Sequence, residues 1–492
     1  MTELSFPQNE FTRKEVTAHT KDGDKKVVYR AYEHIPYVTK PVDIEYQSLD
    51  VWVPETVDGV EVDVQNAPIL FVIGVGGYMS CNNYHKGMMP GMPGPGGPDG
   101  MPPMGGPGEE GPAMLPGLGG AEGPGENKAL AMAYGFVIVA PGCRGRDCQA
   151  PDGTYFGKAP AAIVDLKAAV RYLREMGDAI PGNKERILST GGSAGGALSC
   201  LLGASGNSPL YDEYLTAIGA ADQRDDIFAS CSFSPIMDLE HADGGYEWQY
   251  GKVPCGGQAT GPIRVVPGVV DQTLSAELRD SYIRYVNELA LTGKDGFGPV
   301  TGDNLSDYLM EAYLLPAATR YIAALSDAER ADYLAKTSYI TYADGKASFT
   351  WAAFVEAEGR MKGLPAFDDF GKEMAEPDLF GTETAKTRHF TSFSKAHDPS
   401  ETDDVIGDEL AHIIDMMNPY YFAKNNNPGC APHWWMRYGA IDRDTSIPVF
   451  TGLATILENN GKDVNARLVW EGGHCADDDP DGVMIWMKKL SN

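Results

Sequence analysis

The sequence predicts an α/β fold with a mostly parallel central sheet and a large, mainly helical insertion. Two continuous apolar and β-branched runs, at residues 68–75 (PILFVIGV) and 135–141 (GFVIVAP), are typical of buried parallel strands. An amphipathic helical pattern follows the second run and leads to a third strand at residues 186–190, which predicts a right-handed parallel crossover. The strand pattern is then interrupted and resumes near residue 434.

The helix before the third strand has a clear apolar face. Four residues recur there at helical spacing: Ile163, Leu166, Val170 and Leu173. We expect this face to pack on the sheet. The charged residues Asp165, Lys167 and Arg171 should turn away from it.

The order of the patterns predicts a core that is divided by an insertion. Residues 1–235, which include a further strand at 228–233, and residues 426–492 form the two parts of the core. Residues 236–425 have helical patterns near 276–290, 305–324 and 351–361, and we interpret them as an inserted lid domain. The second part of the core contains strands at 434–441 and 465–470, a helix at 448–459 and a C-terminal helix.

One segment of the first part has no structural periodicity. Residues 88–127 are rich in Gly, Pro and Met and follow neither the strand nor the helix period. Such a segment cannot form a packed core. We expect a flexible surface loop.

Composition and charge exclude several kinds of partner. The chain of 492 residues has 40 Lys and Arg against 69 Asp and Glu, a net charge of −29, which disfavours nucleic acid and anionic membranes. The beginning of the sequence lacks a secretory signal and no run reaches the roughly 18 apolar residues of a membrane span. We therefore expect a cytoplasmic protein. Eight cysteines without CxxC spacing indicate free thiols instead of a zinc site.

The pattern Gly-x-Ser-x-Gly at residues 191–195 carries the chemistry. It lies between a predicted strand and a small-residue helix, which is the setting of the nucleophile elbow of α/β-hydrolase enzymes. The turn is so sharp that side chains two positions before and after the serine would collide with neighbouring elements. We therefore predict the α/β-hydrolase fold with Ser193 as the nucleophile.

A serine nucleophile needs a histidine base and a carboxylate that orients the histidine. In the α/β-hydrolase fold the acid follows the serine in the sequence, and the histidine follows the acid. Asp442 follows the strand at 434–441, and His474 follows the last strand. Asp444 competes with Asp442, which we favour. His433 and His85 are the rival histidines.

The oxyanion intermediate requires two backbone N–H donors. One belongs to the residue after the nucleophile, Ala194. The other should come from the loop after the strand at 68–75, where Gly77 is favoured and Tyr78 is the alternative. No residue pattern points to a metal or an organic cofactor.

Six segments together resemble bacterial tannases of subtype B. They are VGGYM (75–79), GGSAGG (191–196), RMKGLPAFD (360–368), EPDLFG (376–381), HWWMRYGAIDRDTS (433–446) and EGGH (471–474). The resemblance implies a lid-bearing serine esterase that hydrolyses galloyl esters and depsides without a cofactor. It also implies the triad Ser193, Asp442 and His474, in agreement with the residue patterns.

The resemblance adds a binding site for the galloyl ring. It implies that Lys362, Glu376 and Asp444 hold the phenolic hydroxyls of a small aromatic ester. Charge-assisted hydrogen bonds suit this task because phenols donate well to carboxylates and accept from an ammonium. Some fungal tannases bridge cysteines beside the serine and the histidine, but Gly192 precedes Ser193 here.

Two other functions compete with this interpretation. A feruloyl or general carboxylesterase would share the fold and the triad but accept methoxylated or aliphatic acyl groups, and a peptidase of the fold ranks lower. A non-catalytic binding protein usually lacks a triad member or an elbow glycine, and all of these are intact here.

Overall fold

The structure is a computed structural model that describes residues 3–82, 126–257, 259–260, 263–398, 400 and 406–491. Most of the predicted loop at 88–127 lies outside the described residues, as does His85. The last two residues of that segment begin helix α1 (Glu126–Ala133).

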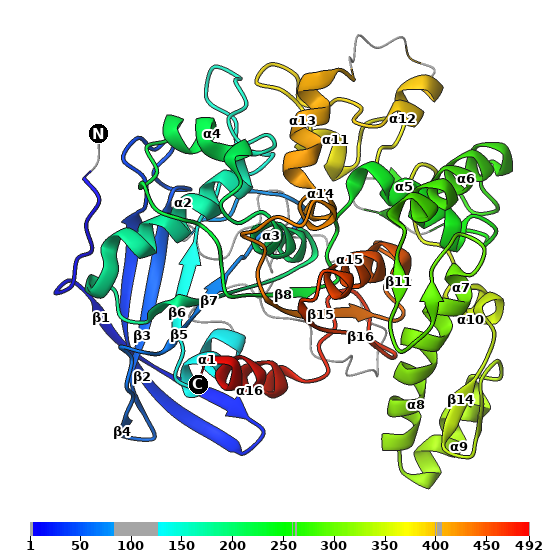
Figure 1. Cartoon of the computed structure of the whole chain (residues 1–492), viewed down its shortest axis with the longest axis horizontal. Helices are drawn as coiled ribbons and strands as arrows, with labels where there is room; N and C mark the ends of the chain where they lie inside the picture. The colour runs from blue at the N-terminus through cyan, green and yellow to red at the C-terminus, as the bar shows by residue number, and fades with distance from the viewer. Residues whose placement is uncertain are drawn as a thin grey trace, which may run out of the picture.

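A ten-stranded sheet forms the centre of the described chain (Figure 1). The strand order is β1-β2-β3-β6-β5-β7-β8-β15-β16, with the short β4 paired to β3. The strands are β1 (Thr12–Thr20), β2 (Gly23–Pro36), β3 (Ser48–Val57), β4 (Val60–Glu61), β5 (Pro68–Val72), β6 (Val137–Pro141), β7 (Asn183–Gly192), β8 (Ala229–Phe233), β15 (His433–Gly439) and β16 (Asp463–Val469). From β6 to β16 all neighbours are parallel. The predicted α/β class with a mostly parallel sheet is confirmed.

The antiparallel side of the sheet was not anticipated from the sequence. β1, β2 and β3 pair antiparallel and join the parallel part through β6. β1 (TRKEVTAHT) is largely exposed, so it lacks the continuous apolar run that reveals a strand buried on both faces.

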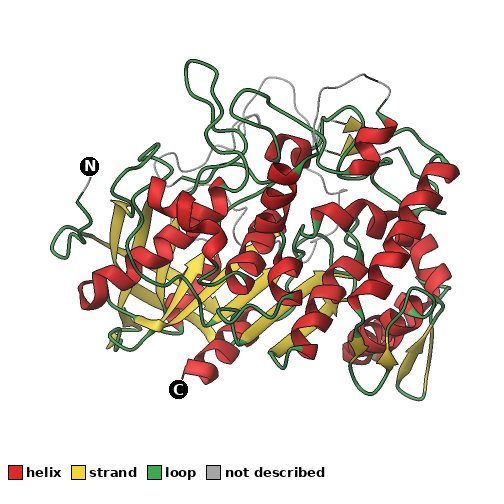
Figure 2. Ribbon diagram, turned by 45° about the horizontal axis from the view of Figure 1, so that its top comes forward, coloured by secondary structure: helices red, strands yellow, loops and turns green. Residues whose placement is uncertain are grey.

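Helices cover both faces of the sheet (Figure 2). The helices of the core are α1, α2 (Ala161–Met176), α3 (Ser193–Ala204), α4 (Asp212–Ala217), α15 (Ile447–Asn459) and α16 (Pro480–Ser491). Residues of α2, α3 and α15 share one apolar core, and residues of α1 and α16 share a second. Ile163, Leu166, Val170 and Leu173 are all fully buried in the first core, as their spacing predicts.

The expectation for the charged residues of α2 needs correction. Asp165 and Lys167 are completely buried, and only Arg171 keeps some exposure. Asp165 receives hydrogen bonds from Arg144, at 2.8 and 2.9 Å, and Lys167 donates to Asp225 at 2.8 Å. The loop after β6 and the segment before β8 carry these partners and cover this side of the helix. Paired in this way, the charges avoid the cost of isolated burial.

The chain leaves the sheet after β8 and returns at β15. The helices between them are α5 (Leu239–Tyr250), α6 (Gln272–Leu289), α7 (Leu305–Leu309), α8 (Leu315–Ala324), α9 (Asp327–Lys336), α10 (Trp351–Glu358), α11 (Ala375–Leu379), α12 (Ser392–His397), α13 (Asp408–Met417) and α14 (Pro419–Lys424). Three two-stranded sheets accompany them: β9 (Ala259–Thr260) with β10 (Ile263–Arg264), β11 (Thr292–Gly293) with β12 (Gly298–Pro299), and β13 (Thr341–Ala343) with β14 (Lys346–Ser348).

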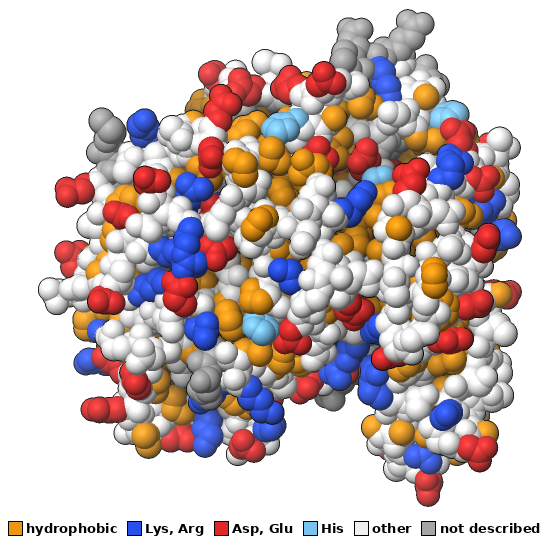
Figure 3. Space-filling model, viewed as in Figure 1, with side chains coloured by type: hydrophobic (Ala, Val, Ile, Leu, Met, Phe, Trp, Pro, Cys, Tyr) orange, Lys and Arg blue, Asp and Glu red, His pale blue; other side chains and the backbone are white. Residues whose placement is uncertain are grey.

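The intervening segment lies beyond one edge of the sheet and along one end of it (Figure 1). α8 packs against the edge strand β16, while α14 packs on α3 and α15. The space-filling view shows the lobe that carries α8 and α9 projecting from the rest of the molecule, with acidic and basic side chains interspersed over this face (Figure 3). Among the helices of the described residues, none combines the length and the apolar composition needed to cross a bilayer.

Candidate active site

The predicted nucleophile lies where strand β7 passes directly into helix α3. β7 ends at Gly192 and α3 begins at Ser193, so no residue separates the strand from the helix. Ser193 has a φ of 56°, in the left-handed region that non-glycine residues rarely adopt. Such strain is typical of functional turns, where the surroundings hold the backbone in place.

The two glycines around Ser193 are required by close backbone approach. A Cβ atom on Gly191 would lie 2.4 Å from the carbonyl oxygen of Gly195. A Cβ atom on Gly195 would lie 2.7 Å from the carbonyl oxygen of Ile73, in the segment after β5. The clash that the sequence pattern predicts is therefore present at both positions.

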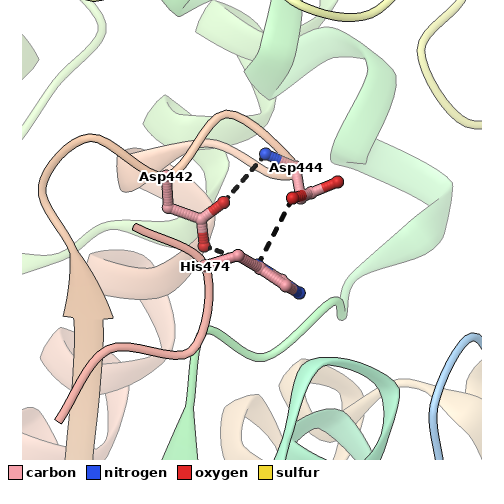
Figure 4. A group of neighbouring side chains, drawn as sticks. All are labelled: Asp442, Asp444 and His474. Carbon is pink, nitrogen blue, oxygen red and sulfur yellow. Dashed lines mark hydrogen bonds and ion pairs between the residues drawn. The ribbon is translucent and has the colours of Figure 1, made fainter. Parts of the chain in front are cut away.

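Asp442 and His474 lie side by side although they are separated by 32 residues. They follow the parallel strands β15 and β16, which are in register from His433 and Asp463 to Gly439 and Val469. Because the carboxyl ends of these strands are level, the two loops meet. Nδ1 of His474 lies 2.8 Å from Oδ2 of the buried Asp442 (Figure 4).

Burial and the Asp442 carboxylate act in opposite directions on the pKa of His474. Burial lowers the pKa of His474, but the Asp442 carboxylate and its hydrogen bond outweigh burial and hold the pKa well above its ordinary value. Asp442 therefore stabilises the charge that His474 would acquire on accepting a proton.

Asp444 occupies the same loop in a different role. Its backbone N–H donates to Oδ1 of Asp442 at 2.8 Å, and its own Oδ2 lies 3.6 Å from Nδ1 of His474 (Figure 4). Asp444 is 37% exposed whereas the Asp442 side chain has no exposure. Asp442 thus makes the short contact to His474, and Asp444 keeps an accessible carboxylate. Ligand atoms of the three side chains lie within 4.8 Å of one another, so they could also hold a metal ion.

The elbow and the His474 loop meet directly. A Cβ atom on Gly192 would lie 2.9 Å from Sγ of Cys475, the residue after His474. The carbonyl oxygen of Ser193 accepts a hydrogen bond from Ile236 N at 3.3 Å, and Cys475 N donates to the hydroxyl of Ser234 at 3.0 Å. Residues that follow β8 therefore hold both the elbow and the histidine loop.

The predicted oxyanion donors lie on two adjoining turns. Residues 76–79 form a turn in which Met79 N donates to Gly76 O at 2.9 Å, and Gly77 and Tyr78 have positive φ of 54° and 56°, as in a type I′ turn. Gly195 N donates to Val75 O at 2.9 Å and so ties this segment to the elbow. Ala194 lies in the first turn of α3, where backbone N–H groups have no partner within the helix.

Two of the predicted ring-binding residues are buried charges. Lys362 and Glu376 are each only 5% exposed. The Lys362 ammonium lies 4.0 Å from the ring centre of Phe367. Burial raises the pKa of Glu376, while Lys362, a backbone hydrogen bond and Arg146 act in the opposite direction. Among the described residues, none hydrogen-bonds the buried Oε2 atom of Glu376. An unmatched buried acceptor of this kind suits a ligand that donates a hydrogen bond.

Sequence reasoning missed a residue that connects these parts. The hydroxyl of Tyr246, in α5, donates to Arg443 O at 3.0 Å and accepts from the backbone N–H of Lys362 at 3.0 Å. It thereby joins the loop of Asp442 and Asp444 to the segment that carries Lys362. A single tyrosine among 24 carries no sequence signal for such a contact.

Comparison with known proteins identifies relatives over the whole chain. A family model described as BD-FAE matches residues 154–254. No curated protein matches the chain. A solved Fusobacterium nucleatum tannase is 32% identical, with 100% of both chains covered and a TM-score of 0.81.

Two other solved structures agree with this relative. The native tannin acyl hydrolase from Lactobacillus plantarum is 31% identical, with 99% of both chains covered and a TM-score of 0.81. A tannin acyl hydrolase in complex with ethyl gallate is 31% identical over 99% of both chains, with a TM-score of 0.80. Given this identity over the full length, the chain belongs to the tannase family, and it is a carboxylic ester hydrolase with the α/β-hydrolase fold.

Proposed function

We propose that the protein hydrolyses galloyl esters and depsides of hydrolysable tannins and releases gallate. The observation that carries this proposal is the position of Asp444. Its Oδ2 atom lies 3.6 Å from Nδ1 of His474, so a carboxylate suited to a phenolic hydroxyl stands next to the histidine of the site. The related tannin acyl hydrolases in complex with ethyl gallate and with 3,4-dihydroxybenzoate support the same substrate class.

In the proposed mechanism, His474 removes the proton of Ser193 as the serine oxygen attacks the ester carbonyl. Asp442 orients the imidazole and stabilises the imidazolium. The N–H groups of Ala194 and Gly77 stabilise the oxyanion. The C–O bond to the alcohol then breaks, His474 gives its proton to the departing alcohol, and a galloyl ester on Ser193 remains. His474 then removes a proton from a water molecule, whose oxygen attacks the carbonyl of the acyl-enzyme. The bond between the acyl group and Ser193 breaks, His474 returns the proton to Ser193, and gallate is released.

The proposed ring site consists of Lys362, Glu376 and Asp444. The unmatched Oε2 of Glu376 would accept a hydrogen bond from a phenolic hydroxyl, and the Lys362 ammonium would donate to one. Such a site discriminates strongly, because a ring without hydroxyls leaves buried polar groups unpaired, at a cost of roughly 10⁴ to 10⁵ in specificity.

We also propose that residues 236–425 act as a lid on the core. Tyr246, Lys362 and Glu376 all belong to this segment, while Ser193 and His474 belong to the core. Under this proposal the alcohol and acyl halves of the substrate are held between the two parts of the chain.

The test is a comparison of purified wild type on methyl gallate, methyl ferulate and methyl benzoate, with Ser193→Ala as the control for contaminating esterase. We expect strong preference for methyl gallate, complete loss in Ser193→Ala, and a galloyl mass increment on wild type in rapidly quenched samples. Activity should also survive EDTA. Comparable rates on the three esters would instead indicate a general carboxylesterase, and preference for methyl ferulate a feruloyl esterase. Absence of turnover on every ester would favour a binding protein.

A further inference from the structure

The loop after β6 holds the turn that carries the predicted oxyanion donor Gly77. The backbone N–H of Arg146 donates to Tyr78 O at 3.0 Å, and Nε of Arg146 donates to Gly77 O at 2.7 Å. The next residue, Asp147, accepts from Ser80 N at 2.6 Å and from Ser80 Oγ at 2.8 Å. Arg146 donates two of these hydrogen bonds and Asp147 accepts the other two, and together they hold the turn and the residue that follows it.

The backbones of the loop and the turn also touch. A Cβ atom on Gly145 would lie 2.0 Å from the backbone nitrogen of Ser80. This close contact prevents the turn at residues 76–79 from moving toward the loop after β6. The hydrogen bonds of Arg146 and Asp147 hold it against moving away. This degree of restraint suits a group that must meet a developing oxyanion without reorganising.

The same arginine reaches the ring-binding segment of the insertion. Its terminal nitrogen forms an ion pair with Asp378, which lies two residues after Glu376. Lys158 binds the other carboxylate oxygen of Asp378 and donates to the backbone carbonyl of Arg146 at 2.9 Å. The Arg146 side chain is 21% exposed and the Asp378 side chain 8%. The bridge is thus largely shielded from solvent and is not a surface ion pair.

We propose that Arg146 is a positioning residue for ester hydrolysis, which bridges the oxyanion turn at Gly77 to the ring-binding segment through Asp378. The inference rests on the proposed function for the role of Glu376, but not for the role of the turn. The planar guanidinium can serve two acceptors in fixed directions at once, which a lysine ammonium on a flexible stem cannot do with the same geometry.

The consequence is a fixed geometry between the two ends of the acyl group. The ester carbonyl would meet the turn at Gly77, while the ring hydroxyls would meet Glu376. A small displacement between these two points would misalign the carbonyl with Ser193, and misplacement by about 1 Å can cost on the order of 100-fold in rate.

The experiment measures kcat and KM of Arg146→Ala and Arg146→Lys on methyl gallate and on p-nitrophenyl acetate, an ester without a ring-bearing acyl group. We expect kcat to fall by roughly 10- to 100-fold on both esters, with KM for p-nitrophenyl acetate nearly unchanged. Methylguanidinium should restore part of the lost kcat of Arg146→Ala. Arg330→Ala is the control, because the Arg330 side chain also donates to backbone carbonyls and pairs with an aspartate, and it is 27% exposed.

An unchanged kcat on p-nitrophenyl acetate in a folded variant would overturn the proposal, as would a loss confined to KM for methyl gallate. If Arg146→Ala does not fold, Arg146→Lys is judged by the same two criteria, because it retains the positive charge. Failure of the proposed function would be recognised by a different result, namely wild type showing no preference for methyl gallate over methyl benzoate. In that case the kcat of the Arg146 variants on p-nitrophenyl acetate would still decide the role of Arg146.

Discussion

The hydroxyl of Tyr246 accepts a hydrogen bond of 3.0 Å from the backbone N–H of Lys362. The same hydroxyl donates to Arg443 O, so one buried side chain fixes the distance between Lys362 and the loop of Asp444. Both of these residues belong to the proposed ring site. Under the proposed function, Tyr246 would influence recognition of the ring while lying outside the reacting groups.

Tyr246→Phe is expected to weaken methyl gallate binding selectively. The substitution keeps the ring and removes the hydroxyl that joins the two segments. At about 1 kcal/mol for each of the two lost hydrogen bonds, KM should rise by up to roughly 30-fold. Steady-state kinetics on methyl gallate and p-nitrophenyl acetate check this. Tyr172→Phe is the control, because it loses a bond of 2.7 Å from a tyrosine hydroxyl to a backbone carbonyl, that of Ser5. An equal loss on both esters would contradict a role in ring recognition.

The acidic limb of the pH profile should report His474. Since Asp442 holds the pKa of His474 well above its ordinary value and the base must be neutral, kcat/KM should rise with pH through that raised pKa. Asp442→Asn removes the raising influence, so the limb should move to lower pH while kcat falls by about 10⁴, the loss known for serine protease triads.

Asp444→Asn provides the comparison for this profile. Asp444 is farther from Nδ1 of His474, at 3.6 Å against 2.8 Å, and more exposed, so its removal should move the limb much less. The pH profiles are measured on p-nitrophenyl acetate, so that titration of His474 is separated from binding of the galloyl ring. If the acidic limb does not move in Asp442→Asn, the assignment of Asp442 as the carboxylate that raises the pKa of His474 is refuted.

Replacement of Lys362 should make methyl gallate binding more sensitive to acid. Burial raises the pKa of Glu376 and Lys362 lowers it, so Lys362→Met should raise that pKa further. As the pH is lowered, Glu376 would then become protonated earlier than in wild type. The accompanying increase in KM for methyl gallate would therefore begin at a higher pH than in wild type. At neutral pH we expect KM to rise by roughly 10-fold or more, as for a lost charged hydrogen bond.

Lys294→Met is the matched control for this change. Lys294 also lies in the insertion with its ammonium over an aromatic ring, 3.8 Å from the centre of Tyr313. It should leave the pH dependence of KM as in wild type. If Lys294→Met and Lys362→Met behaved alike, the effect would come from lost insertion stability and not from Glu376.

Gly195→Ala should disrupt the elbow. The added methyl group would lie 2.7 Å from Ile73 O and 2.9 Å from Val75 O, both backbone atoms, so the strand end or the helix must shift. We expect the free energy of unfolding to fall by about 1–3 kcal/mol and kcat by on the order of 100-fold. Denaturant unfolding and kinetics check this. Gly473→Ala, where a Cβ atom meets nothing within 4 Å, should leave the unfolding free energy unchanged.

The parallel half of the sheet and the elbow could be predicted from the amino-acid sequence. A strand that is buried on both faces must be apolar along its whole length, and a turn as tight as residues 191–195 must have glycine where backbones touch. Both requirements fall on consecutive residues, so they leave a signature in the sequence. The order of the strands then places Asp442 and His474 at the same edge of the sheet.

Features that depend on partners distant in the chain could not be predicted from the sequence. The charges of α2 are buried because Arg144 and Asp225 reach them from other segments, a fact that helical spacing cannot reveal. The antiparallel strands β1 to β3, the contact of Tyr246 with Lys362, and the bridge from Arg146 to Asp378 are of the same kind. Each of these features is made by polar or partly exposed residues. In the sequence such residues look like ordinary surface residues, because the partners that hydrogen-bond them are brought close only by the fold.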